Sequence, residues 1–155
     1  MKEMVKNNKG ITLAALVITI IVMTIIASIA VYQGKEIIAK SKVQSLETNM
    51  LTIQAKARAY SEEIESKVWA LSDKEDQRTQ AFSEKGLTRI NSTDEYTVEN
   101  TALTAMGLGE LTGEEYTVIF SDNYKSIDVK FTAGIKYNNK LYYKLSEIQT
   151  ALRED

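Results

Sequence analysis

The chain has 155 residues, enough for one ordinary domain, and contains no cysteine, histidine or proline. It therefore lacks disulfide frameworks, thiolate or imidazole metal ligands, and the usual nucleophile–base pairs of hydrolases. Its net charge of −2, with no large basic cluster, argues against a nucleic-acid partner.

Residues 1–10 form a short basic leader, in which Lys2, Lys6 and Lys9 outnumber Glu3. Positive charge ahead of a first apolar segment favours a cytoplasmic N-terminus. Lysines also follow the segment, so the charge difference across it is modest. The predicted location is a single pass through the cytoplasmic membrane, with the N-terminus inside and the remainder outside.

Residues 11–32 carry no charged side chain. A helix needs ~20 apolar residues to cross a bilayer core, so this segment predicts a transmembrane helix. Its hydroxyl groups can bond to carbonyls of the preceding turn, which applies to Thr12, Thr19, Thr24 and Ser28. Small residues recur four apart, and this spacing lets helices approach closely, as at Ala15/Thr19, Thr24/Ser28 and Ala30/Gly34.

Three interpretations of this segment compete. It is an uncleaved anchor, or an ordinary secretory signal cleaved after Ala30, or a signal cut at the junction of Lys9, Gly10 and Ile11. The second interpretation needs an apolar region well beyond the usual ~7–15 residues.

Lys9-Gly10 followed by ITLAALVITIIVMTIIASIAVY resembles the class III signal of type IV prepilins and type II secretion pseudopilins. The segment is similar to that of pilin-like proteins of Gram-positive bacteria. The resemblance implies that a prepilin peptidase cuts between Gly10 and Ile11, that Ile11 is N-methylated, and that the helix polymerises with other pilin subunits. A glycine at the cut leaves the peptidase carboxylates free access to the backbone. The residues to which the resemblance gives an assembly role are Thr12, Leu13, Ala15, Leu16, Thr19, Thr24 and Ser28.

Two positions depart from the family pattern. Pilins usually carry Glu as the fifth mature residue, where it neutralises a neighbour's terminal amine, and this chain has Ala15. Since an unpaired charge in hydrocarbon is unfavourable, the departure favours a minor pilin, a tip subunit, or a lineage that neutralises the amine in another way. The twenty-second mature residue, often Pro, is Tyr32, so we expect a straighter helix.

Residues 33–71 continue as an amphipathic helix. An apolar stripe recurs in steps of three and four, at Val43, Leu46, Met50, Ile53, Ala57, Tyr60 and Ile64. Packing on the chain's own head is favoured over a free coiled coil, and the pilin resemblance implies the same arrangement.

Residues 72–155 form the predicted extracytoplasmic head. Ser72 to Glu75 reads as a capping box that opens a polar helix ending before Gly86. The stretch 87–97 is predicted to be a polar surface loop, and 101–106 a brief helix. Three acidic residues, Asp94, Glu95 and Glu99, are interpreted as a solvated surface rather than a calcium site.

From Tyr116 onward the apolar period falls to two, which predicts three or four short antiparallel strands. Ala133-Gly134 is predicted to turn the chain, and Asn138-Asn139 to form a tight hairpin turn. A capping box from Ser146 to Gln149 predicts a closing helix through Leu152. Three tyrosines, Tyr137, Tyr142 and Tyr143, either form an adhesive surface or, as we favour, alternate between core and strand face.

The predicted fold class is α+β, a long N-terminal helix packed on a small antiparallel meander, as in pilins. We find no catalytic, cofactor or metal motif and expect no enzyme activity. The predicted function is a structural subunit, pilin or pseudopilin, of a type IV pilus-like or type II secretion-like filament. The alternative is a membrane-anchored or secreted binding protein with a non-pilin signal.

Overall fold

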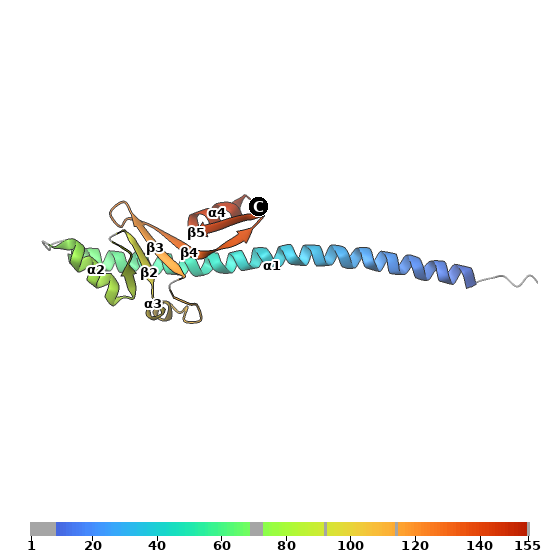
Figure 1. The fold of residues 1–155 in the computed structure, drawn as a ribbon, viewed down its shortest axis with the longest axis horizontal. Coiled ribbons are helices and arrows are strands. Elements are labelled where there is room, and N and C mark those ends of the chain that lie inside the picture. Colours follow the sequence, from blue (N-terminus) through green and yellow to red (C-terminus); the bar gives the residue numbers. More distant parts are fainter. Residues whose placement is uncertain (1–8, 69–72, 92, 114, 155) are drawn as a thin grey trace, which may run out of the picture. The chain divides into compact units, whose positions relative to one another are not determined.

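The computed structural model describes residues 9–68, 73–91, 93–113 and 115–154, with side chains in the first range at 15–31 and 34–68. Contacts divide the chain into two compact units, one ending at Ser41 and the other, called the head unit here, beginning at Lys42. The elements (Figure 1) are α1 (Lys9–Val68), α2 (Lys74–Glu84), β1 (Leu87–Arg89), β2 (Glu95–Val98), α3 (Asn100–Ala105), β3 (Tyr116–Ser121), β4 (Ser126–Tyr137), β5 (Lys140–Lys144) and α4 (Leu145–Arg153).

Helix α1 runs for 60 residues without a break. This confirms the nearly continuous helix predicted from Ile11 to about Leu71, although Trp69 and Leu71 themselves lie outside the described residues. The chain has no proline to remove a backbone donor, and beyond Gly10 in the first turn, Gly34 is the single glycine within α1. One glycine lowers helix stability by only ~1 kcal/mol, which is too little to end a helix of this length.

The head unit is built on a five-stranded antiparallel sheet in the order β1-β2-β3-β4-β5, with α3 inserted between β2 and β3. The α+β class is therefore confirmed, and the meander has one or two strands more than predicted. Five strands give a sheet with one apolar face, which needs a cover.

The head-unit part of α1 supplies that cover (Figure 1). Six of the seven predicted stripe residues are buried, and Tyr60 is half-buried against the same core. Two polar contacts fix the helix direction on the sheet. Gln54 Nε2 donates to the Ile127 carbonyl at 2.7 Å, and Ser61 Oγ donates to the Tyr124 carbonyl at 3.3 Å.

The prediction of a surface loop over 87–97 is wrong. Leu87 to Arg89 pairs with Tyr96 to Val98 as the antiparallel pair β1–β2. Leu87, Tyr96 and Val98 are fully buried in the core, while Thr88 is exposed and Thr97 is half-buried. The predicted helix over 101–106 is confirmed by α3, which occupies Asn100–Ala105.

Helix α2 ends before Gly86, as predicted, but its start differs from the predicted capping box. Asp73 occupies the N-cap position without a side-chain bond, and Ser72 lies outside the described residues. Gly86 adopts a φ of +76°, and a Cβ there would lie 2.7 Å from Thr101 Oγ1. Glycine is thus needed both for the backbone turn and for the close approach of α3.

The β4–β5 hairpin turns at Asn138 and Asn139, whose φ values of 47° and 61° confirm the predicted tight turn. Ala133-Gly134 does not turn the chain. Strand β4 passes through it with an irregularity between Lys130 and Ile135.

Helix α4 also starts differently from the prediction, since its N-cap is Lys144 rather than Ser146. Glu147 Oε2 accepts the N–H groups of Tyr143 and Lys144 at 3.1 and 3.2 Å. Ser146 instead donates its hydroxyl to Asp128 at 2.7 Å.

Candidate functional site

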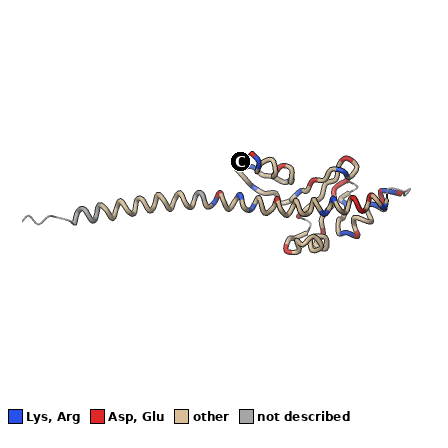
Figure 2. The backbone as a smooth tube through the Cα atoms, turned by 180° about the vertical axis from the view of Figure 1, so that it is seen from behind, with Lys and Arg blue, Asp and Glu red and all other residues tan. Residues whose placement is uncertain are grey.

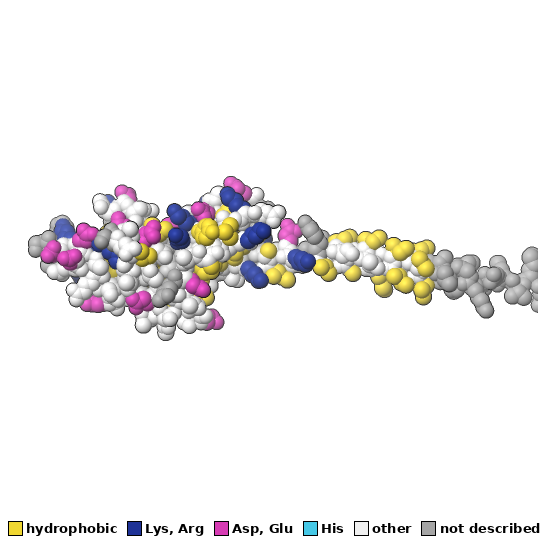
Figure 3. Space-filling model, viewed as in Figure 1, with side chains coloured by type: hydrophobic (Ala, Val, Ile, Leu, Met, Phe, Trp, Pro, Cys, Tyr) yellow, Lys and Arg dark blue, Asp and Glu magenta, His cyan; other side chains and the backbone are white. Residues whose placement is uncertain are grey.

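The apolar first part of α1 is the most unusual surface of the described chain. Every large apolar side chain from Leu16 to Val31 is exposed, with exposed fractions between 44% and 66%. Figure 3 shows these side chains in yellow along the helix, with white backbone and hydroxyl residues between them, and Figure 2 shows no charged residue among them. The helix is long and apolar enough to cross a membrane.

The hydroxyl groups of this segment are satisfied within the helix. Thr19 donates to the Ala15 carbonyl, Thr24 to the Ile20 carbonyl and Ser28 to the Thr24 carbonyl, each at 2.7 Å. This confirms the predicted return of these hydroxyls to the preceding turn, while the Thr12 side chain lies outside what is described. No unpaired hydroxyl from these three residues therefore opposes burial in an apolar phase.

The small residues form two ridges that the helix places on opposite sides. Ala15 and Thr19 are followed nine residues later by Thr24 and Ser28, and α1 is helical throughout. At roughly 100° per residue, nine residues rotate the chain by about 180°. The second ridge lines a shallow hollow with Ala27, Val31 and Lys35. A helix with small residues on two opposite faces can approach one neighbour on each side.

The predicted processing residues Lys9 and Gly10 form the first turn of α1 together with Ile11. Their side chains, and those of Thr12 and Leu13, lie outside the described residues, so the predicted cleavage and methylation stay predictions. Ala15 and Leu16 are described, and both are exposed.

Sequence reasoning missed two apolar residues beyond the predicted span. Ile37 and Ile38 are 68% and 58% exposed, although Lys35 and Glu36 separate them from the apolar run. The sequence could have indicated their exposure, because both residues lie ahead of the amphipathic stripe, which begins at Val43.

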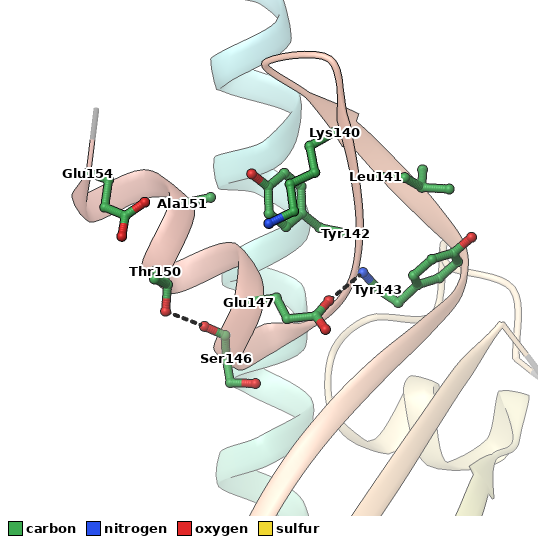
Figure 4. A pocket seen from close by; sticks show the side chains of 9 residues that line it. All are labelled: Lys140, Leu141, Tyr142, Tyr143, Ser146, Glu147, Thr150, Ala151 and Glu154. Carbon is green, nitrogen blue, oxygen red and sulfur yellow. Dashed lines mark hydrogen bonds between the residues drawn. The ribbon is translucent and has the colours of Figure 1, made fainter.

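The head unit carries a second candidate surface, a hollow of about 440 Å³ between β5 and α4. Tyr142 and Lys140 line its strand side, with the Lys140 Nζ 5.2 Å from the Tyr142 ring centre (Figure 4). Glu147 lies at its base, where the two N–H groups of Tyr143 and Lys144 lower the pKa of its carboxyl. The three tyrosines alternate as favoured, since Tyr137 is buried, Tyr142 half-buried and Tyr143 exposed.

The polar groups of this hollow serve the fold. Ser146 donates to a carboxylate that also accepts the Val129 N–H, and Thr150 donates to the Ser146 carbonyl at 2.9 Å. Among the residues that the structure describes, no cluster of three carboxylates comes together to hold a metal ion.

An aromatic cluster joins the far ends of the sheet and α2. The Phe82 ring lies 4.9 Å from Tyr96 and 5.0 Å from Phe120, and the Tyr96 and Tyr124 hydroxyls are 3.1 Å apart. Arg78 stacks over the Tyr124 ring at 4.3 Å and pairs with Glu65. Burial, followed by the Tyr96 hydrogen bond, raises the pKa of Tyr124.

No protein-family model, curated protein or solved structure matches the chain.

Proposed function

We propose that the chain is a structural subunit, pilin or pseudopilin, that inserts in the cytoplasmic membrane through residues 11–32 and polymerises through that helix. The observation that carries the proposal is the run of exposed apolar side chains from Leu16 to Val31. Burying one large aliphatic side chain is worth ~1.5–3 kcal/mol, so this surface requires lipid or other apolar helices.

The two opposite small-residue ridges support a polymer rather than an isolated anchor. A pair of copies related by two-fold symmetry uses the same patch on both chains, which leaves the second ridge unused. An open assembly uses both ridges of each subunit, because every inner subunit has a neighbour on either side. The residues concerned are Ala15, Thr19, Thr24 and Ser28.

The subunit's role follows from Ala15. A carboxylate at this position would neutralise the terminal amine of a neighbouring subunit after cleavage at Ile11. Without it, the chain is expected to join a filament of other subunits and to form long filaments poorly by itself. Replacing Ala15 with Glu should raise the yield of homopolymer. Abundant homopolymer from the natural chain, lost in Ala15→Glu, would contradict the minor-subunit role.

The deciding experiment is mass spectrometry of the mature N-terminus in cells that contain a prepilin peptidase. A methylated Ile11 terminus supports the proposal, and Gly10→Leu should then accumulate the uncut precursor. Gly34→Leu is the matched control, because a Cβ at Gly34 would meet nothing within 4 Å. A terminus at Met1 indicates an anchored protein, and one at Val31 a secreted protein, and either result refutes the proposal.

A further inference from the structure

The β4–β5 hairpin carries the most basic short stretch of the head unit. From Lys125 to Lys144 there are five lysines and a single acidic residue, Asp128. Four exposed residues near its turn are called the hairpin patch here, namely Lys136, Lys140, Leu141 and Tyr143. Lys136, Leu141 and Tyr143 share one face of the hairpin, and Lys140 lies on the other face, beside the hollow next to α4. Leu141 and Tyr143 are 48% and 38% exposed, and the only other large exposed apolar residue described in the head unit is Leu51.

The apolar members of the patch are held in place on one face. Leu141 pairs with Lys136 across the strands, and Tyr143 lies two residues further along the same side. Figure 4 shows Leu141 and Tyr143 pointing together away from α4. The Tyr143 ring covers Gly134 so closely that a Cβ there would lie 2.7 Å from the ring. Glu147 accepts the Tyr143 N–H from the opposite side, which fixes the backbone beneath the ring.

The hairpin tip lies at the end of the head unit where α1 enters it (Figure 1). The Tyr124 carbonyl meets Ser61, and the Ile127 carbonyl meets Gln54. Strand β4 therefore runs antiparallel to α1, and its C-terminal end lies toward Val43. The chain leads from there to the apolar segment, whose last residue is Tyr32.

We propose that the hairpin patch rests on an anionic phospholipid surface. Tyrosine and leucine side chains next to lysine are typical of protein surfaces that anchor at the membrane–water interface. Each lysine close to an anionic bilayer raises the bound population about fivefold. This inference rests on the proposed insertion of residues 11–32. Insertion tethers the head unit to the bilayer, so that even weak contacts hold the patch there.

A second copy of the chain fits the patch less well. Three of the acidic residues at the other end of the head unit already have basic partners within the same chain. Glu63 pairs with Lys67 and Lys85, Glu65 with Arg78, and Glu75 with Arg89. These carboxylates are thus locally neutralised and offer little attraction to lysines of another copy.

The natural absence of cysteine makes the test direct. Full-length Lys140→Cys and Lys125→Cys chains are labelled with an environment-sensitive fluorophore and reconstituted in vesicles. The two changes remove the same charge at opposite ends of β4, since Lys125 lies in the β3–β4 turn. The quencher is a nitroxide carried on a lipid, in vesicles of phosphatidylcholine with or without phosphatidylglycerol.

We expect the label at residue 140 to be quenched in vesicles that contain phosphatidylglycerol, and the label at residue 125 to stay unquenched. High salt should reverse the quenching at residue 140. Lys136→Gln in the Lys140→Cys chain should lower the quenched population about fivefold. Equal quenching at both positions refutes the inference. So does a signal at 140 that depends on protein density rather than lipid charge, which would indicate a second copy. Extraction of the chain by carbonate instead shows that the span does not insert, and refutes the proposed function separately.

Discussion

Replacing Ile53 with Ala tests whether the helix stripe holds the head unit together. Ile53 is fully buried, in the middle of the apolar face that α1 lays on the sheet. Its neighbour Gln54 is fixed to β4 by the bond to the Ile127 carbonyl, so the helix cannot easily shift to fill the space. Removing a buried isoleucine side chain usually lowers the free energy of unfolding by ~2–5 kcal/mol, and we expect about 3.

The effect is readily measured by thermal unfolding. For a folding unit of roughly 110 residues, 1 kcal/mol corresponds to about 4 °C in Tm, so the variant should melt about 12 °C lower. The apolar part of α1 stays helical in detergent, and near-UV circular dichroism of the buried tyrosines Tyr96, Tyr116 and Tyr137 is therefore the better signal. Leu51→Ala is the matched control, because Leu51 lies on the same helix but is 38% exposed.

Equal melting temperatures for the two variants would refute the reasoning. The stripe would then pack against something other than the sheet, and the buried fraction of Ile53 would carry no stability. A loss confined to Ile53→Ala, with unchanged membrane extraction, supports the packed helix and separates it from insertion.

Three further changes test single features. Gly86→Ala should lower the free energy of unfolding by ~2–4 kcal/mol, because its Cβ would meet Thr101, whereas Gly107→Ala, equally at positive φ (+79°) but in open space, should lose only ~1 kcal/mol. The Glu147 carboxylate, whose pKa is lowered, stabilises the head unit at neutral pH, and this contribution is lost as pH falls through the folded pKa. The melting temperatures of Glu147→Gln and the parent should therefore converge in acid. The neutral Tyr124 side chain, whose pKa is raised, stabilises the head unit below the usual tyrosine pKa of ~10, and this contribution is lost at higher pH. The Tm of Tyr124→Phe should therefore fall less at alkaline pH than the Tm of the parent.

The features that the sequence predicted well are those with local causes. The apolar stripe of α1 repeats every three or four residues over six turns, and proline is absent. Both the helix and its buried face could therefore be predicted from the sequence. The Asn138-Asn139 turn was readable for the same reason, because asparagine tolerates positive φ at low energy. The five-residue strand after it, β5, then followed from alternation.

The features that were missed depend on partners far along the chain. Strand β1 has three residues and β2 four, too short for a period to emerge from a polar background. Tyr96 is buried because Phe82 and Phe120 surround it, and Phe120 lies 24 residues downstream. Ala133-Gly134 resembled a turn, but the glycine is needed to admit the Tyr143 ring. At α4, Ser146 is drawn to Asp128, which left the capping role to Glu147.

The boundary between membrane segment and head also follows from packing rather than composition. We predicted a segment at 33–71 that packs on a head at 72–155, and the core includes Val43, Met50 and Ile64 from α1. Among the described elements, the sheet's apolar face has no other long helix to cover it, because α2 and α4 have 11 and 9 residues and each buries only one or two of them. A fragment that starts at Lys74 would therefore expose that face to water and is expected to aggregate. One that starts at Lys42 keeps the whole stripe, so it should remain soluble and show the near-UV spectrum of the parent. Cooperative melting of the Lys74 fragment would mean that the sheet completes its core without α1.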